Sequence, residues 1–183
     1  MLKRLRIGFI AALRARVGRL FERARTERSK KRAEFKRVDL SRLTEKVLLP
    51  FEPLFFERSL EFERVIEPGL TVGGSAQQLS ELLSILLDNA LRYALPVGEV
   101  RLRLRAEPSR RCCLVVSNAA KEMSIGQLKR ILKSSGRADS EPPRALRPGL
   151  SIAADIVEAH HGKIWAEWDY GRICFFVELP TRK

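Results

Sequence analysis

The most regular apolar pattern of the chain runs through residues 75–95. Leucine and isoleucine recur there at helical spacing, and Ser75 with Gln78 forms the capping-box pattern that opens a helix. Pro96 follows the last apolar turn and cannot continue a helix. The pattern therefore predicts one long, largely apolar central helix over these residues.

One face of this predicted helix carries polar chemistry. Arg92 and Tyr93 follow Asn89 by three and four residues. Ile85 precedes it by four, so that these residues share one face. An amide oxygen can ligate a cation, a guanidinium suits phosphate oxygens, and an aromatic ring can lie on a nucleobase. Spacing alone leaves two interpretations open: a nucleotide-binding face, or a core helix whose asparagine caps a neighbouring loop.

Period-two alternation marks the strands of a sheet. Residues 100–106 place apolar side chains on one side and Arg101, Arg103 and Arg105 on the other, which predicts a strand with one buried and one solvent-facing side. Residues 112–117 are apolar on both sides and predict a central strand. The other predicted strands cover residues 60–66, residues 70–72 and a hairpin that turns at Tyr170 and Gly171.

Further helices are predicted for residues 2–35, 41–56, 125–132 and 150–160. The second of them has Asp39 as its N-cap, and Pro50 and Pro53 are expected to bend or shorten it. Residues 134–148 have no periodicity and are rich in Pro and Arg, which is typical of a lid or a binding loop. Strands are grouped at the two ends of the chain around helices, with an antiparallel pair in the middle. This order predicts an α+β fold, a two-layer α/β sandwich with helices on one face of the sheet.

Positive charge is concentrated at the N-terminal end. Of the net charge of +13, residues 1–40 carry +10, with fourteen Lys and Arg against four Asp and Glu. Together with an apolar seam at intervals of three and four, this predicts a basic amphipathic helix. Its partner stays open: a second helix in a coiled-coil homodimer, an anionic membrane surface bound through residues 1–24, or nucleic acid. Low aromatic content argues against nucleic acid.

The sequence predicts neither a membrane span nor disulfides. The longest apolar run near the start, residues 7–13, is far shorter than the roughly 20 residues that a bilayer requires, and no signal-peptide cleavage pattern follows it. Three cysteines, two of them adjacent in an apolar strand, fit buried thiols in a reducing compartment. We therefore expect a cytoplasmic location, with peripheral attachment at the inner membrane face if the basic helix binds lipid.

A series of short motifs follows along residues 35–180. In order they read Phe-Lys-Arg-Val-Asp-Leu, Leu-Leu-Asp-Asn-Ala-Leu-Arg-Tyr, Leu-Val-Val-Ser-Asn, Gly-Arg-Ala-Asp-Ser, Gly-Leu-Ser-Ile-Ala, Ile-Val-Glu-Ala-His-His-Gly-Lys-Ile and Phe-Phe-Val-Glu-Leu-Pro. This order resembles the catalytic, ATP-binding domain of sensor histidine kinases. The resemblance implies the Bergerat (GHKL) ATPase fold for residues 39–183. It also implies that residues 1–38 are a remnant of the helical dimerisation domain or a replacement for it.

In that family the central helix carries an asparagine box. By the match, Asn89 would ligate the Mg²⁺ that bridges the ATP phosphates, Arg92 would contact a phosphate, and Tyr93 would pack on the nucleotide. An earlier position of the box, often Asn in the family, is Ile85 here, which removes one polar group from the site.

The first glycine-rich box of the family is altered. Its adenine-binding motif, Asp-x-Gly-x-Gly, falls on residues 118–122. Asn118 would accept a hydrogen bond from the adenine amino group through an amide oxygen, without the charge of a carboxylate. Ala120 and Glu122 replace the two glycines, and each replacement would cost on the order of 1 kcal/mol if the backbone required a positive φ.

The second glycine-rich box is altered too. It falls on residues 145–150, where Gly149 and Leu150 remain at the start of a helix whose free amides would bind phosphate. Arg137, Arg144 and Arg147 would add positive charge around the phosphates. Equally, Pro142, Pro143 and Pro148 would hold this loop in a shape that admits no nucleotide.

The sequence offers no phosphoacceptor. A histidine kinase phosphorylates a His in its dimerisation helices, whereas His160 and His161, the two histidines of the chain, lie in a catalytic-domain motif. We therefore expect no autophosphorylation in cis. The first hypothesis is an ATP-dependent protein-histidine kinase domain, truncated or split, that binds Mg-ATP at Asn89 and phosphorylates a His on another chain.

Two alternatives stay open. One is a nucleotide-free pseudokinase that acts as a scaffold in two-component signalling. The other is a stand-alone Ser/Thr kinase of the anti-sigma type, which shares the fold but which the long N-terminal helix disfavours. Under the kinase hypotheses the expected partners are a histidine kinase dimerisation domain or a response regulator.

Overall fold

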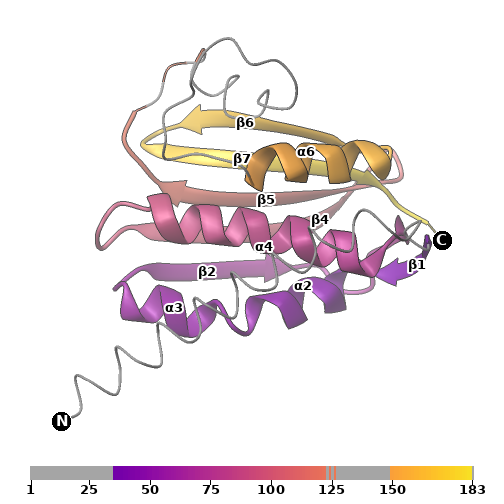
Figure 1. The fold of residues 1–183 in the computed structure, drawn as a ribbon, viewed down its shortest axis with the longest axis horizontal. Coiled ribbons are helices and arrows are strands. Elements are labelled where there is room, and N and C mark those ends of the chain that lie inside the picture. The colour runs from indigo at the N-terminus through magenta and orange to yellow at the C-terminus, as the bar shows by residue number, and fades with distance from the viewer. Residues whose placement is uncertain (1–34, 123, 125, 127–148, 183) are drawn as a thin grey trace. The chain divides into compact units, whose positions relative to one another are not determined.

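The computed structural model describes residues 35–122, 124, 126 and 149–182 (Figure 1). The elements in chain order are β1 (Lys36–Asp39), α2 (Leu40–Leu48), α3 (Glu52–Glu57), β2 (Glu61–Ile66), β3 (Thr71–Gly74), α4 (Ala76–Tyr93), β4 (Glu99–Glu107), β5 (Arg111–Ala119), α6 (Gly149–Ala159), β6 (Lys163–Asp169) and β7 (Arg172–Pro180). The predicted N-terminal helix, apart from Phe35, and the predicted helix at 125–132, apart from Gly126, lie outside the described residues, as does the loop that contains Arg137 and Arg147.

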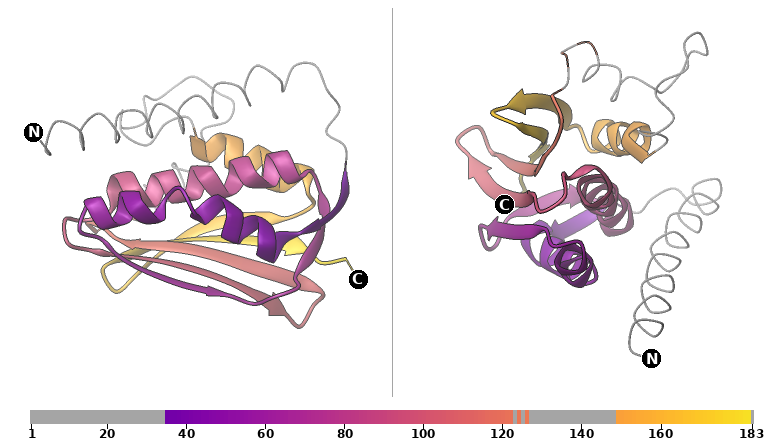
Figure 2. Two further views of the ribbon diagram at one scale, coloured as in Figure 1. Left: turned by 90° about the horizontal axis from the view of Figure 1, so that it is seen from below. Right: turned by 90° about the vertical axis from the view of Figure 1, so that its left-hand side faces the viewer.

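Two sheets and one layer of helices make up the described domain. The main sheet has the strand order β2-β4-β5-β7-β6, and β1 with β3 forms a separate antiparallel pair. Within the main sheet β2 and β4 run parallel, and the remaining neighbours run antiparallel. The helices α2, α3, α4 and α6 all lie on one face of this sheet (Figure 2). The predicted two-layer α+β sandwich is therefore confirmed.

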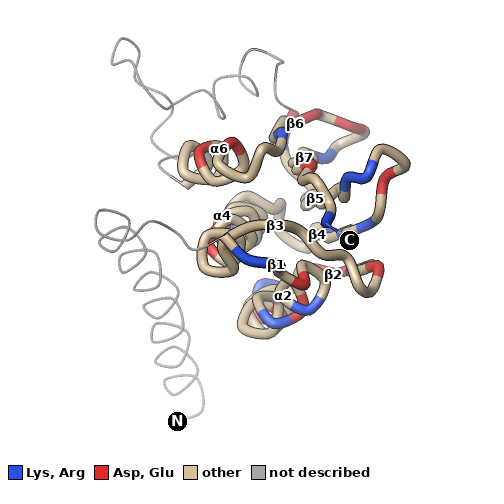
Figure 3. The backbone as a smooth tube through the Cα atoms, turned by 90° about the vertical axis from the view of Figure 1, so that its right-hand side faces the viewer, with Lys and Arg blue, Asp and Glu red and all other residues tan. Residues whose placement is uncertain are grey.

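The two faces of the sheet differ as the alternation predicts. On the helix-covered face β4, β5 and β7 place Val, Leu, Ile and Phe side chains that are almost fully buried. On the other face Arg101, Arg103 and Arg105 reach toward solvent and form ion pairs with acidic neighbours, such as Arg101 Nε with Glu63 Oε2 at 2.8 Å. Figure 3 shows segments with Lys and Arg next to segments with Asp and Glu on the side of the domain that faces the viewer.

The predicted helix at 41–56 is two helices in the structure. Asp39 is the N-cap, as expected, and accepts a hydrogen bond from the Arg42 amide at 2.9 Å. The first helix ends at Leu48, because Pro50 brings no N–H and crowds the preceding turn. A short second helix then begins at Glu52, with a proline in its first turn.

Strand β1 is a correction to the sequence analysis, which placed residues 36–38 in the N-terminal helical segment. Residues 36–39 instead pair with β3, with Val38 opposite Val72, and both of these valines are buried. The compact folded unit accordingly begins at Phe35. In the described part of the chain, none of the helices has the length and apolarity that a membrane crossing requires.

Candidate functional site

Helix α4 supplies the central asparagine. Ser75 caps the helix and accepts a hydrogen bond from the Gln78 amide, as the capping-box pattern predicts. Fourteen residues later Asn89 is 9 % exposed, on a helix that is buried along most of its length. Its side-chain amide forms no hydrogen bond with another described residue. Because no described residue engages this amide and the side chain keeps some exposure, it is available to a ligand.

The last turn of α4 carries the charged and aromatic residues. Arg92 Nε lies 2.7 Å from Asp88 Oδ2, and the Arg92 side chain is 65 % exposed. An exposed ion pair of this kind contributes little to stability, so the guanidinium can exchange its carboxylate for a phosphate at low cost. Tyr93 is half-buried. Burial raises the pKa of its phenol, and the charge of the adjacent Arg92 partly offsets this rise.

Helix α6 begins against the same face of α4. A side chain at Gly149 would place its Cβ 3.2 Å from Ile85 Cγ2, so the backbone of Gly149 packs directly on Ile85. Ile85 lies one helical turn before Asn89 on the same face. The N-terminus of α6 therefore lies beside the α4 face that carries Asn89. Leu150, the other predicted residue of this box, is buried and anchors α6 in the core.

Asn118 stands at the end of β5 on the helix-covered face. Its side chain is fully buried, and its Nδ2 donates a hydrogen bond to the Ala119 carbonyl at 3.1 Å. Its Oδ1 is buried without a partner in the part of the chain that the structure describes. Because Nδ2 is held by a carbonyl, Oδ1 is left as an acceptor that awaits a donor. Two other buried atoms share this state, Gln78 Oε1 and Arg111 Nε, but the latter lies 3.2 Å from Glu178 Oε2.

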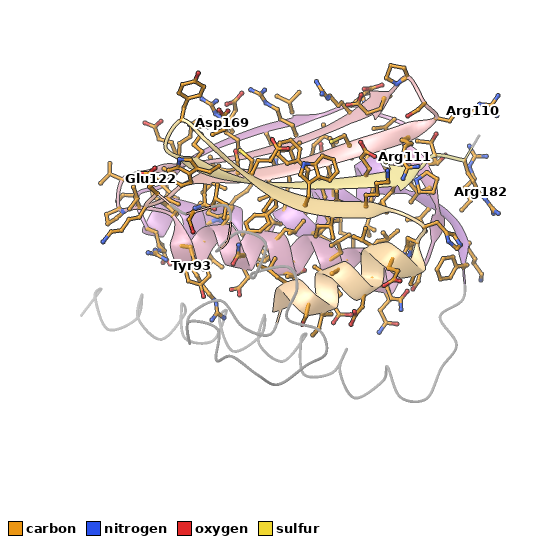
Figure 4. All side chains as sticks on the ribbon, turned by 90° about the horizontal axis from the view of Figure 1, so that it is seen from above. Tyr93, Arg110, Arg111, Glu122, Asp169 and Arg182 are labelled. Carbon is orange, nitrogen blue, oxygen red and sulfur yellow. The ribbon has the colours of Figure 1, made fainter. Side chains whose placement is uncertain are left out.

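The residues that stand in place of the two glycines of the first box have ordinary backbone conformations. Neither Ala120 nor Glu122 adopts a positive φ. The chain here is held by backbone hydrogen bonds instead: the Leu95 amide donates to the Ala119 carbonyl at 2.9 Å, and the Ala120 amide donates to the Gly171 carbonyl at 3.1 Å. Tyr93, Glu122 and Asp169 accordingly lie at one end of the domain (Figure 4). No local sequence signal pointed to the contacts of Leu95 and Gly171, which join segments far apart in the chain.

The residues present fit a Mg²⁺-bound nucleotide. A group of three or more His, Cys, Asp or Glu side chains that could hold a metal ion by themselves does not occur in the described residues. Asn89 would supply one amide oxygen, and Mg²⁺ readily completes its shell with phosphate and water oxygens. Asn118 would supply the acceptor for the base, and the first amides of α6 would face the phosphates. The structure brings together Asn89, Tyr93, Asn118, Ala120, Gly149 and Leu150 on neighbouring elements.

Known proteins resemble this chain in sequence. Residues 74–183 match the family described as histidine kinase-, DNA gyrase B-, and HSP90-like ATPase. The sensor protein DltS of Streptococcus agalactiae is 31 % identical over 165 residues, which cover 88 % of this chain and 41 % of DltS. The histidine-protein kinase BaeS of Escherichia coli is 30 % identical over 150 residues, which cover 80 % of this chain and 32 % of BaeS. The chain thus spans less than half the length of these curated relatives.

The fold agrees as well. The crystal structure of histidine kinase ThkA in complex with the response regulator TrrA matches with a TM-score of 0.72 and 22 % identity, over 96 % of this chain and 50 % of that chain. With the family match extending over more than half of its length, the chain belongs to the histidine kinase-, DNA gyrase B- and HSP90-like ATPases.

Proposed function

We propose that this chain carries the ATP-binding catalytic domain of a two-component sensor histidine kinase, which transfers a phosphoryl group from Mg-ATP to a His on another chain. In this proposal the catalytic domain comprises the predicted residues 39–183, extended at its start by the remainder of strand β1 (Lys36–Asp39). Residues 1–34 form the helical segment that contacts a partner.

The observation that carries the proposal is the orphan acceptor of Asn118. A fully buried amide oxygen without a donor costs about 1–3 kcal/mol, and a nucleobase amino group would satisfy it. Asn89 and the N-terminus of α6 lie on the same helix-covered side of the sheet. One site therefore combines an acceptor for a base, an amide for a phosphate-bound cation and helix amides for phosphate. These features favour a nucleotide-binding domain over the nucleotide-free scaffold.

Phosphoryl transfer requires the domain to position the ATP phosphates and to neutralise their charge. The bond between the γ-phosphorus and the β–γ bridging oxygen breaks, and a bond between that phosphorus and an imidazole nitrogen forms, with ADP as the leaving group. Arg92 and the first amides of α6 would hold the phosphates in line for this transfer. Tyr93, whose phenol pKa is raised by burial, would pack on the nucleotide and exclude water from it.

The proposed partners follow from the missing acceptor. ThkA was crystallised with the response regulator TrrA, and a regulator or a dimerisation domain is the partner that we propose for this chain. The basic amphipathic pattern of residues 1–24 suits a partner helix in a coiled coil or an anionic membrane surface.

Calorimetric titration of Mg-ATP into the full chain tests the proposal. We expect binding with a Kd between micromolar and sub-millimolar values, which Asn89→Ala weakens by at least about 30-fold. Ser80→Ala is the matched control, because Ser80 lies on the same helix with an exposed hydroxyl that only contacts the Ala76 carbonyl. Absence of heat and of thermal stabilisation at millimolar Mg-ATP would contradict the proposal and leave the scaffold. Transfer of label from ATP to an added His-bearing dimerisation domain would extend it to catalysis.

A further inference from the structure

The residue that follows α6 joins several distant segments. His160 is 2 % exposed, and its ring stacks on Phe35 with the two ring centroids 4.7 Å apart. It also lies against Gly74 so closely that a side-chain Cβ there would sit 2.3 Å from His160 Cδ2. The ring thus occupies space beside Gly74 that the side chain of any other residue at position 74 would fill.

The two partners of the ring fix its tautomer. The Ser75 backbone N–H donates to His160 Nε2 at 3.1 Å, and a donor of this kind requires an unprotonated nitrogen. The Ile156 carbonyl lies 2.7 Å from Nδ1 and can only accept, so Nδ1 carries the proton. Both bonds are therefore made by the neutral ring alone. A proton on Nε2 would set two donors against each other and place an uncompensated charge in a buried position.

These bonds connect the two helices of the candidate site at their far ends. Ser75 is the N-cap of α4, the helix that carries Asn89. Ile156 belongs to α6, the helix that begins at Gly149 against Ile85. His160 therefore fastens the start of one helix to the end of the other, and fixes how the two run past each other.

The surroundings of the ring hold it neutral. Phe35, Gly74 and Ser75 pack on it from the chain before β1, from β3 and from the start of α4, and none of them is charged. Burial lowers the pKa of the ring, the bond to Ile156 partly offsets this, and the neighbouring His161 lowers it further. Lys36, a charged residue, pairs with Gly74 in the β1–β3 register.

We propose that neutral His160 is a positioning residue which holds α4 and α6 in register for nucleotide binding, so that Mg-ATP affinity falls when the ring is protonated. The proposal rests on the proposed function. Because an ordinary His has a pKa of about 6.5, the unfolded chain takes up this proton at a higher pH than the folded domain does. The free energy of unfolding therefore falls as pH drops below about 6.5, and Mg-ATP affinity falls in the same direction.

Two substitutions separate the two bonds of the ring. In His160→Gln the amide oxygen can accept from the Ser75 N–H, and the side chain does not titrate. In His160→Asn the amide nitrogen can donate to the Ile156 carbonyl, and the acceptor for Ser75 is lost. We expect His160→Gln to bind Mg-ATP within about 3-fold of wild type at pH 7.5, because it keeps the bond to Ser75 that joins the two helices. His160→Asn should bind about 10-fold more weakly, because it keeps only the bond to Ile156, which lies within the end of α6.

The pH profile is the readout that packing alone would not change. Mg-ATP affinity is measured from pH 5.5 to 8, at a temperature where circular dichroism shows every variant folded. The phosphates of ATP titrate in the same range, so His160→Gln provides the baseline, and we expect the wild type to lose affinity more steeply than this variant at low pH. His161→Asn, which removes the other histidine at an exposed position with positive φ, should still lose affinity more steeply than His160→Gln at low pH, with the loss beginning at a slightly higher pH because His161 no longer lowers the pKa of His160.

The imidazole can also be observed directly. With only two histidines in the chain, the NMR signals of His160 are identified by comparison with His161→Asn. We expect the Nδ1–H tautomer and a midpoint below 6.5, and Phe35→Ala should move that midpoint upward because it uncovers the ring. Identical pH profiles for wild type and His160→Gln, in a chain that binds Mg-ATP normally at pH 7.5, overturn this inference alone. A wild type that binds no Mg-ATP overturns the proposed function and this inference with it.

Discussion

The two ends of α4 use buried polar side chains in opposite ways. At its start, Ser75 accepts from Gln78 with its hydroxyl and donates to His160 with its amide, so the cap is fully engaged within the fold. Toward its end, Asn89 is nearly buried and forms no hydrogen bond with another described residue, and the Asn118 oxygen on the same side of the sheet is also without a donor. Engaged polar groups hold the helix in place, whereas unengaged ones at a helix end are available to a ligand.

This contrast separates what mutations at each end should change. Substitutions at the start of α4 should lower the free energy of unfolding, and they should weaken nucleotide binding because the site is then less stably folded. Substitutions toward the end should change binding and leave stability nearly untouched.

The largest expected effect lies at the start of the helix. Gly74→Ala would place a Cβ 2.3 Å from His160, push the ring out of its seat and break the bond to Ser75. We expect a loss of about 3 kcal/mol in the free energy of unfolding, measured by urea denaturation. Gly171→Ala is the matched control, because a Cβ at this position would contact no other atom. Only the positive φ of +82° opposes the substitution, which should cost about 1 kcal/mol. Equal losses of unfolding free energy in the two variants would show that the packing of His160 on Gly74 contributes nothing to stability.

The next effect lies at the other end. Asn89→Ala should weaken Mg-ATP binding by at least about 30-fold, close to 2 kcal/mol, while it changes the free energy of unfolding by less than about 1 kcal/mol, because the amide has no described partner to lose. Calorimetry and urea denaturation measure the two quantities. A large loss of stability with unchanged affinity would mean that Asn89 caps a neighbouring loop, which is the alternative that the sequence left open.

Sequence patterning predicted those elements whose signals are local. Helix α4 has its cap, its apolar spacing and its terminating proline within one stretch of chain, and the alternation of residues 100–106 revealed both faces of β4. Strand β1 was missed because its four residues hold one buried side chain, Val38, and its pairing with β3 is a tertiary contact. The break between α2 and α3 follows from Pro50, whose effect on a helix is known in kind but not in position.

The candidate site divides along the same line. Asn89 and Asn118 were identified from motifs, but the sequence could not say that the Asn118 oxygen would lack a donor. The bond between Ser75 and His160 joins residues 85 positions apart, and the packing of Gly149 on Ile85 joins two helices. Contacts of this range are set by the packing of the whole domain, so no local pattern encodes them.

A smaller effect is expected where the family has a carboxylate. Asn118→Asp restores a charged acceptor for a base amino group, and charge-assisted hydrogen bonds are stronger than neutral ones. We expect Mg-ATP affinity to rise about 5-fold, close to 1 kcal/mol. The free energy of unfolding should fall by about 1 kcal/mol, because the new carboxylate loses the bond to Ala119 and is buried. Mg-GTP serves as the comparison, since a gain shared equally by both nucleotides would show that residue 118 does not meet the base amino group.

The smallest effect concerns the ion pair beside the site. Asp88→Asn removes the carboxylate that Arg92 contacts at 2.7 Å, and we expect a change in the free energy of unfolding below about 0.5 kcal/mol because the Arg92 side chain is 65 % exposed. The freed guanidinium should bind Mg-ATP about 2-fold more tightly, with a steeper dependence on salt. Arg42→Gln breaks a similar pair with Asp39, far along the chain from the site, and should leave affinity unchanged. Weaker binding by Asp88→Asn would contradict the role of Arg92 as the phosphate contact. Asp88 would then be a group that the bound cation needs, and the phosphate end of the site would centre on its carboxylate.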